Sequence, residues 1–278
     1  MQRYDECIAA CDIVLKDKKI ALVKTSNLWS GIFQSGNSNE SIFEFQYGNN
    51  QKGKFNKMLF QSYGSNTIAA HLFAPVDSRN WDLTTIFEAE GNTAETDLRY
   101  YNSFYSGANA TASAIQKFST SESSSANWVV YRLAEIYLTK AESLVQQNYD
   151  ENKEEAMSLI NKTYMRAHID LLESDSLKLV SYETKEKLVD LILRERQREF
   201  LFEGKRWFDL LRTSRRETDN PMRVFDEFIL RNIDSNYRAL AQGKFKNEWA
   251  RYLPLPLADI EGNPNLVQNP FYATSIIK

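Results

Sequence analysis

Histidine and cysteine are scarce in this sequence, with two of each among 278 residues. Neither His71 nor His168 lies beside a plausible nucleophile, so Ser/His and Cys/His catalysis have no support. The four residues also lack the spacing of a zinc site. Cys7 and Cys11 share one helical face, where they are poorly placed to form a disulfide, and both are expected to be small buried residues. We therefore expect no catalytic residue, no metal and no cofactor.

Glycine and proline are also sparse, and no apolar run approaches the roughly 18–20 residues of a membrane-spanning helix. The formal net charge is -3 and acids are interleaved with the basic residues, so no nucleic-acid partner is indicated. No Gly-rich phosphate loop, Gly-x-Ser-x-Gly elbow or His-Glu-x-x-His pair is present. Met1 is followed at once by polar residues, so no signal peptide is recognisable there. The 42% apolar content is typical of a globular protein.

Amphipathic stripes predict four long helices, at residues 3–16, 128–147, 153–168 and 184–203. The second and third are joined by a short turn, which predicts an αα-hairpin of tetratricopeptide type. Because such arrays usually need about three repeats, an N-terminal part of the scaffold is expected to be absent. Thr184 is a candidate N-cap of the fourth helix, and Gly204 stands where a C-cap glycine would.

Two further segments are predicted in the C-terminal part, a helix at 222–233 and an extended, turn-rich tail at 251–272 with four prolines. A short strand is predicted at 41–47 from its alternation. The fold class is thus mainly α, with tetratricopeptide-like hairpins and a large irregular loop region. We expect one domain, 1–278, in three parts: scaffold end and strand (1–47), variable loop region (48–127), and helical core with tail (128–278).

The loop region at 48–127 mixes aromatic rings with short polar side chains, as sugar recognition requires. Its aromatics argue against disorder. The alternative is that these rings pack the loop onto the helices. The candidate ligand-binding residues are Trp81, Asp82, Arg99, Tyr100, Tyr101 and Tyr105.

The helix at 184–203 places Glu195 and Glu199 on the stripe that should face the core. Glutamates stacked on one helix face repel one another unless nearby arginines neutralise their charge. The first interpretation is a pair of carboxylates for glycosidase-type acid/base work. The second is a buried ion-pair network that fixes helix packing, and we favour it. Its expected members are Arg132, Glu135, Glu195, Arg196, Glu199, Glu203, Arg206 and Asp209.

Four segments, in order, resemble the SusD/RagB family. Residues Tyr131 to Glu142 are similar to its "RLAEVYLLKAEA" helix, and 155–167 to the following "EAL..LN..R.RA" helix. Residues Arg194 to Leu210 resemble "RERRRELAFEGHRWFDLRR". Residues Leu253 to Pro270 resemble the closing "LPIP..EI..NP.L.QNP.Y". The last two segments are the most specific.

The resemblance implies a mostly helical, non-enzymatic protein that binds oligosaccharides or other nutrients through variable loops. It also implies lipidation at an N-terminal cysteine, a place at the outer-membrane cell surface of Bacteroidetes, and a SusC-like TonB-dependent transporter as partner. The signal peptide, anchor cysteine and first hairpins of the family have no counterpart here, so membrane attachment is expected only through an absent N-terminal lipid anchor. Two alternatives stay open, a helical-repeat module that holds a protein partner without a sugar ligand, and a glycoside hydrolase.

Overall fold

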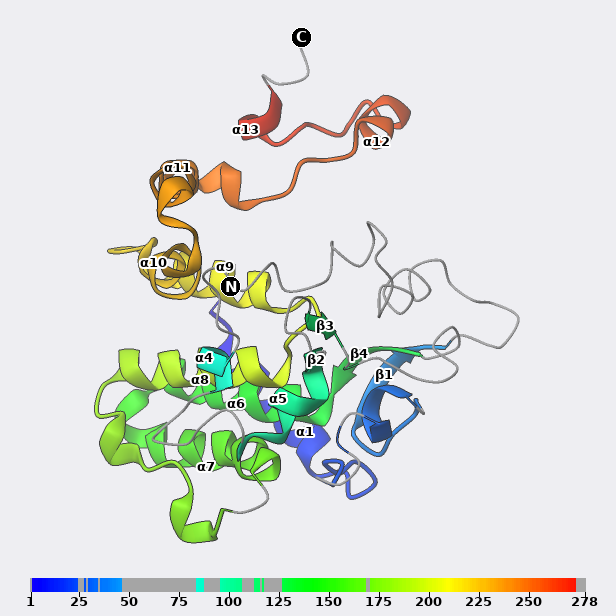
Figure 1. Cartoon of the computed structure of the whole chain (residues 1–278), viewed down its shortest axis with the longest axis vertical. Coiled ribbons are helices and arrows are strands. Elements are labelled where there is room, and N and C mark those ends of the chain that lie inside the picture. The colour runs from blue at the N-terminus through cyan, green and yellow to red at the C-terminus, as the bar shows by residue number, and fades with distance from the viewer. Residues whose placement is uncertain are drawn as a thin grey trace. The chain divides into compact units, whose positions relative to one another are not determined.

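The computed structural model describes residues 2–24, 28, 30–34, 36–46, 84–87, 96–106, 113–115, 117, 127–168 and 171–273. The chain divides into two compact units, Met1–Gly204 and Lys205–Lys278 (Figure 1). The structure is mostly helical, which confirms the mainly α class. No helix in the described ranges is long and apolar enough to cross a membrane. The division of one domain into three parts stays a prediction.

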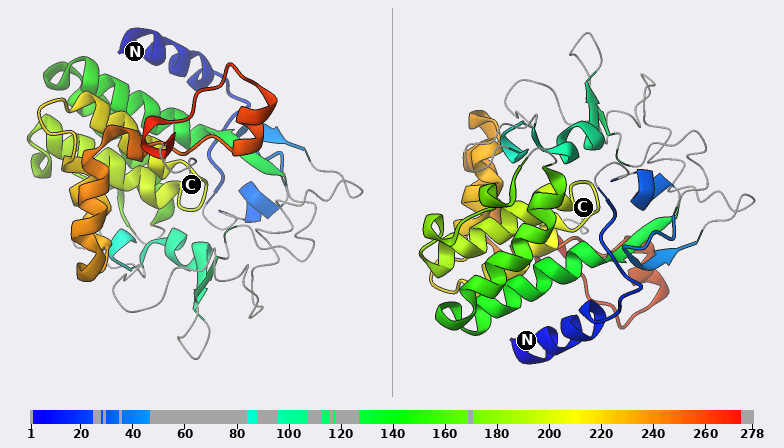
Figure 2. Two further views of the ribbon diagram at one scale, coloured as in Figure 1. Left: turned by 90° about the horizontal axis from the view of Figure 1, so that it is seen from above. Right: turned by 90° about the horizontal axis from the view of Figure 1, so that it is seen from below.

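The four long helices among the described residues of the first unit are α1 (Tyr4–Leu15), α6 (Leu133–Gln147), α7 (Tyr149–Ala167) and α8 (Lys185–Glu199). Helices α6 and α7 form the predicted hairpin, α8 packs on both, and α1 packs on α6 (Figure 2). The predicted boundaries at 3–16 and 153–168 are close to those observed. Cys11 is buried, Cys7 is half-buried, and both thiols are free.

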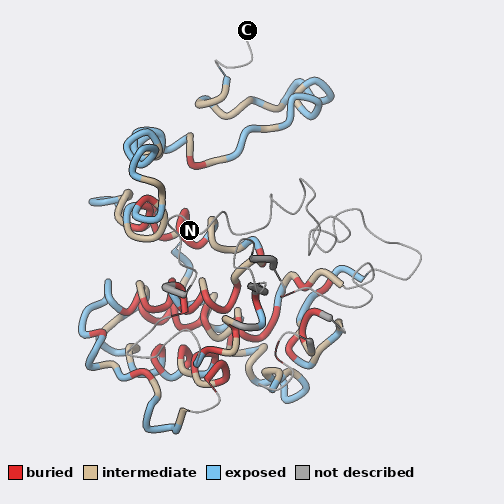
Figure 3. Tube along the Cα trace, viewed as in Figure 1, coloured by how far each residue is buried: buried red, intermediate tan, exposed pale blue. Residues whose placement is uncertain are grey.

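The apolar stripes of these helices face one another and form the core of the unit (Figure 3). On α6 the buried stripe includes Leu138, Ala141 and Val145, and on α7 it includes Ala156 and Ile160. Small residues on the two facing stripes allow a close approach of the helix axes. Side chains cap two of these helices, because Asn148 accepts from the Glu151 N–H and Thr184 from the Lys187 N–H. The Thr184 cap confirms the prediction.

The prediction of helix from residue 128 is wrong for its first five residues. Trp128–Arg132 forms strand β4, which pairs antiparallel with β1 (Ser41–Phe45). Aromatic and β-branched residues dominate this stretch and favour an extended chain. The backbone turns into α6 directly after Arg132, which is still extended. A second antiparallel pair joins β2 (Phe104–Ser106) to β3 (Ser113–Ile115).

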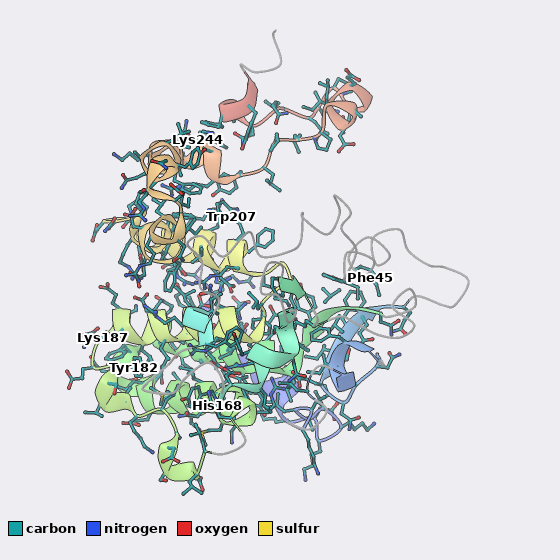
Figure 4. All side chains as sticks on the ribbon, in the orientation of Figure 1. Phe45, His168, Tyr182, Lys187, Trp207 and Lys244 are labelled. Carbon is teal, nitrogen blue, oxygen red and sulfur yellow. The ribbon has the colours of Figure 1, made fainter. Side chains whose placement is uncertain are left out.

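The side chains of β1 face in an unexpected sense. Phe43 and Phe45 are 47% and 52% exposed, and Phe45 is labelled in Figure 4. Glu44 between them is buried and accepts from the Asn37 N–H and from Asn127 Nδ2 at 2.8–3.0 Å. The two phenylalanines of this strand are therefore open to solvent, and Glu44 is its one buried residue.

Short elements complete the first unit. They are the π-helix η2 (Ser30–Gln34), the helices α4 (Thr84–Phe87) and α5 (Leu98–Ser103), and the 3-10 turns η4 (Glu173–Asp175) and η5 (Leu179–Ser181). Leu28, Ile32, Phe33 and Val129 form an apolar cluster between η2 and β4.

Helix α8 ends at Glu199, four residues earlier than predicted. The chain then turns through Phe200–Gly204, where Phe202 and Gly204 have positive φ values of 68° and 75°. Gly204 is thus not the C-cap of α8 but the left-handed residue at the end of this turn.

The second unit contains α9 (Arg206–Arg216), α10 (Arg223–Phe228), η6 (Leu230–Asn232), α11 (Ser235–Lys246), η7 (Glu248–Arg251), α12 (Leu257–Gly262) and α13 (Pro270–Ala273). The predicted helix at 222–233 is interrupted, since Ile229 leaves helical geometry between α10 and η6. The tail at 251–272 is not wholly extended, because α12 and most of α13 lie in it. Trp207, Phe225 and Phe245 pack their rings 5.3–5.8 Å apart in this unit.

We expect opposite effects from alanine at two glycines that both have open space around an added Cβ. Gly204→Ala should lower the free energy of unfolding by about 1–2 kcal/mol, because only φ is strained. Gly243→Ala, inside α11, should raise it by about 0.5–1 kcal/mol. Urea unfolding of both variants checks this, and equal effects would contradict the left-handed turn.

Candidate functional site

The largest cluster of charge in the first unit is buried. Five carboxylates meet five cations there, so the formal charges cancel. The carboxylates are Glu40, Asp97, Glu195, Glu199 and Glu203, and the cations are Arg99, Lys117, Arg132, Arg166 and Arg198. We refer to these ten residues as the ionic cluster.

Glu199, in the last turn of α8, stands at the centre of the cluster. Its carboxylate accepts from Arg132 Nη1 at 2.5 Å, from Arg166 Nη2, and from Arg99 Nη1 at 3.1 Å. Arg132 and Arg166 are bridged a second time by Glu40, at 2.8 and 2.6 Å. One carboxylate of α8 therefore contacts arginines from β4, α7 and α5, and two of these arginines also hold Glu40, the residue before β1.

Arg99 brings the loop region into the cluster. Its guanidinium makes a bidentate pair with Asp97, with Nε–Oδ1 and Nη2–Oδ2 distances of 2.9 and 2.7 Å. It also donates to Glu195 at 2.8 Å, and Glu195 in turn accepts from Thr163 Oγ1 at 2.6 Å. Arg99 is 0% exposed. The positive charge of Arg99 is thus neutralised by carboxylates inside the protein.

Lys117 closes the C-terminal end of α8. Its Nζ donates to the carbonyls of Glu199 and Leu201 at 2.9 and 3.0 Å and to Glu203 Oε1 at 2.6 Å. Arg132 Nη2 donates to the same Glu199 carbonyl at 2.8 Å. The last carbonyls of a helix lack partners within it, and cations are favoured there. A loop residue and a strand residue therefore cap this helix.

Burial and charge oppose each other in the pKa values of the cluster. Burial would raise the pKa of Glu195, but Arg99 and Arg198 outweigh it and lower the pKa to about 2. Burial is likewise outweighed at Glu199, where Arg166, Arg132 and Arg99 hold the pKa well below its usual value. Burial lowers the pKa of Lys117 to about 8, although Glu203 opposes it. Both glutamates are ionised at neutral pH.

A glycosidase needs one carboxyl group that is protonated near neutral pH and a second that faces the sugar. Glu195 and Glu199 satisfy neither condition, because each is 0% exposed and paired with arginines. The geometry therefore gives these two carboxylates a structural role. Among the described residues, no group of three or more His, Cys, Asp or Glu could hold a metal ion.

The remaining expected members of the network lie elsewhere. Arg196 pairs with Glu135 at 3.7 Å, between α8 and α6. Arg206 and Asp209 belong to the second unit, where Arg206 stacks on Phe228 and buried Asp209 accepts from Arg212 at 3.0 Å.

The expected ligand-binding residues divide into four groups. Arg99 is placed differently from the expectation, since it lies in the ionic cluster and not at a surface. Tyr100 is half-buried, and its ring meets Phe87 edge to face at 5.7 Å. Only the backbone is described at Tyr101 in α5 and Tyr105 in β2. Trp81 and Asp82 lie outside the described residues.

Sequence reasoning missed Glu40, Asp97, Lys117 and Arg166, and it assigned Arg99 to ligand binding. A signal was present at Arg166, three residues after Thr163 on the buried face of α7. His168, directly after α7, is buried, which lowers its pKa, and its Nδ1 lies 2.8 Å from the Tyr164 carbonyl.

Glu199→Gln should lower the free energy of unfolding by about 3–5 kcal/mol, because the arginines around it lose a buried counter-charge. Glu154→Gln is the matched control, since Glu154 is exposed on α7. It should change stability by less than about 0.5 kcal/mol. Urea unfolding followed by circular dichroism measures both, and similar losses in the two variants would show that the cluster contributes little.

Stability should fall as pH decreases from about 4.5 toward 2. In this window the unfolded chain binds a proton at Glu195, whose usual pKa is 4.5, while the folded chain with a pKa of about 2 does not. Protons therefore favour the unfolded state. Urea unfolding at several pH values measures the slope, which Glu195→Gln should flatten and Glu154→Gln should leave unchanged. A slope that survives Glu195→Gln would assign the acid sensitivity to other carboxylates.

Known proteins resemble this chain both in sequence and in fold. The chain is 26% identical to SusD-like protein P38 of Formosa agariphila, over 77% of this chain and 49% of that protein. It is 29% identical to SusD-like protein P2 of the same organism, over 52% of this chain and 26% of that protein. The chain thus spans about half the length of the first of these relatives, and less of the second.

Two solved structures show the same fold. A SusD superfamily protein from Bacteroides thetaiotaomicron superposes with a TM-score of 0.65 at 20% identity, covering 96% of this chain and 56% of that one. Surface glycan-binding protein A from Bacteroides uniformis superposes with a TM-score of 0.61 at 19% identity, with the same coverages. The family model described as the SusD family matches residues 76–272, which include most of the ionic cluster and the whole of α6 to α12. The chain belongs to the SusD family.

Proposed function

We propose that this protein binds an oligosaccharide or another nutrient without catalysis, at the bacterial cell surface, for import by a TonB-dependent transporter. Membership of the SusD family supports glycan binding for nutrient uptake in general. The resemblance to a surface glycan-binding protein supports the same class of ligand.

The observation that carries the proposal is the way in which the ionic cluster holds the loop region. Arg99 and Lys117 bracket the segment that contains Tyr100, Tyr101 and Tyr105. Arg99 donates to two glutamates of α8, and Lys117 donates to the last carbonyl of α8 and to Glu203 in the turn that follows. A loop with both ends fixed on a helical core loses less conformational entropy when it binds a ligand. Fixed aromatic rings are the platforms on which sugar C–H faces stack.

The ligand-contacting residues that we propose are Trp81, Asp82, Tyr100, Tyr101 and Tyr105. Arg99 is assigned a different role, because its guanidinium donates only to buried carboxylates. We propose that it holds the backbone at Tyr100 and Tyr101 in place.

Absence of catalysis is proposed from the state of the carboxylates. Glu195 and Glu199 are ionised and buried, so neither can deliver a proton to a glycosidic oxygen. We also propose a SusC-like transporter as partner and a lipid anchor at the outer membrane, which is typical of the family.

A specific observation favours a protein partner as well. Phe43, Phe45 and Tyr131 are each about half exposed on one face of the β1–β4 pair. Exposed aromatic faces of this kind are frequent at protein interfaces. A module that only holds a protein partner is therefore the second candidate function, and it requires no sugar ligand.

A glycan array probed with this chain separates the two candidates. We expect binding to at least one polysaccharide, with a loss of about tenfold or more in Trp81→Ala and Tyr101→Ala, because each substitution removes a stacking ring. Tyr237→Ala, an exposed ring of α11 in the second unit, should bind as the wild type does. The bound glycan should show no new reducing ends after incubation.

Two results would contradict the proposal. If no glycan on the array is bound by the chain, the partner-only module is favoured. If reducing ends accumulate and Glu199→Gln abolishes them, the protein is a hydrolase.

A further inference from the structure

A pocket of about 750 Å³ lies within the second unit, where α9 ends and where η7 follows α11. Small-molecule sites are typically about 300–1,000 Å³, so the pocket is large enough for a ligand. The side chains that bear on its chemistry are Arg215, Lys246, Glu248, Trp249, Arg251 and Tyr252. None of them belongs to the loop region.

Arg251 is the unusual member, since it is only 8% exposed. Its Nε donates to the Phe245 carbonyl at 2.8 Å and its Nη1 to Ser214 Oγ at 3.0 Å. These acceptors are neutral, and within the described ranges no carboxylate forms an ion pair with this guanidinium. Glu248 attracts the guanidinium without forming an ion pair, and the Phe225 ring lies 5.1 Å from it. A buried charge that makes no ion pair is costly. Each terminal nitrogen carries two N–H groups, so donors are left over for a ligand.

The pocket as a whole carries an excess of positive charge. Arg215, Lys246 and Arg251 contribute three positive charges and Glu248 one negative charge, which leaves two. Lys246 and Arg215 are exposed. Lys246 makes no ion pair or side-chain hydrogen bond in the described part of the chain. Such a pocket favours a ligand with at least one negative charge.

One wall of the pocket is aromatic. The Trp249 ring is 46% exposed and lies 6.4 Å from the Tyr252 ring. Arg215 covers one face of the Tyr252 ring at 5.1 Å from its centroid and donates to the Tyr252 hydroxyl at 2.7 Å. Asn269 Nδ2 fixes the backbone beneath both rings through the carbonyls of Trp249 and Tyr252, at 2.9 and 3.1 Å. Trp249 thus presents an exposed ring on a fixed stretch of backbone, in a pocket where Lys246 and Arg251 make no ion pair among the described residues.

We propose that this pocket binds the acidic unit of a glycan, with the sugar ring stacked on Trp249 and its carboxylate or sulfate group paired with Arg251 and Lys246. Planar guanidinium donors match the oxygens of either anion. A C–H face of a sugar ring matches the exposed indole. The inference rests on the proposed glycan binding for the class of ligand, but it places a second site outside the loop of 48–127 and gives that site a charge preference.

Isothermal titration of the whole chain at low salt tests the charge preference with two matched pairs of probes. The first pair is an oligogalacturonate and its methyl ester. The second is a sulfated galactan oligosaccharide and its desulfated form. We expect one acidic probe to bind at least about tenfold more tightly than its neutral partner, and added NaCl to weaken that binding. The member that binds identifies carboxylate or sulfate as the anion.

Two surface variants test the location without removing a buried residue. Lys246→Glu reverses an exposed charge, and Trp249→Ala removes the open ring. Each substitution should weaken binding of the acidic probe by about tenfold or more. Tyr237→Ala should leave the affinity within about twofold, because Tyr237 does not line the pocket. Trp81→Ala should do the same, because Trp81 is assigned to the loop site. Circular dichroism confirms that each variant is folded.

The proposal is overturned if neither acidic probe exceeds its neutral partner, or if both surface variants bind as the wild type does. It is also overturned if inorganic sulfate binds as tightly as the sulfated oligosaccharide, because the ring then contributes nothing. The variants distinguish a failure of the proposed loop site from a failure of this pocket. Loss of neutral-glycan binding in Trp81→Ala concerns the loop alone, whereas loss of acidic-probe binding in Trp249→Ala concerns this pocket alone.

Discussion

Compensation of buried charge is the constraint on which the first unit depends. Ten ionised side chains stand in its interior, and an ion taken out of water costs several kcal/mol even in a relaxed protein. That cost is offset only where each charge meets an opposite charge and its remaining donors find acceptors. The cluster meets both conditions at Arg132, whose Nε and both terminal nitrogens donate to carboxylates or to a helix carbonyl. The positions of β1, β4, α6, α7 and α8 are thereby set together.

An apolar core of the same size would pack these helices with similar stability, since buried ion pairs seldom exceed well-packed hydrophobic residues in their contribution. The ionic arrangement adds a directional constraint that an apolar core would lack. Leucine tolerates a shifted neighbour, whereas the guanidinium of Arg99 must reach Glu195 and Glu199 of α8 while it keeps two parallel hydrogen bonds to Asp97. We infer that the cluster specifies where the loop segments attach to the helical core. Recognition loops can then vary in sequence while their points of attachment stay fixed.

The parts of this fold that the sequence predicts are those governed by short-range periodicity. Helices α1, α7 and α8 follow from apolar stripes, and Glu195 and Glu199 stand out because they interrupt one. The strand Trp128–Arg132 is missed because Val130 and Leu133 extend the stripe of α6 backward, while the pairing partner of the strand lies more than 80 residues away. Glu40 and Lys117 are missed for the same reason. Nothing local marks a loop lysine as the cap of a helix that ends 82 residues later.

Arg99 and Arg251 show why residue type alone could not separate structural from functional positions. Both arginines are buried, both lie close to aromatic residues, and Arg99 seemed the better candidate for a ligand because tyrosines follow it. The distinction lies in their counter-charges. Asp97, Glu195 and Glu199 neutralise Arg99 completely, so a ligand anion would gain nothing from it. Arg251 has only neutral acceptors among the described residues, so an incoming anion would relieve an existing electrostatic cost. The difference depends on residues distant in sequence, and for that reason it becomes visible only in the folded chain.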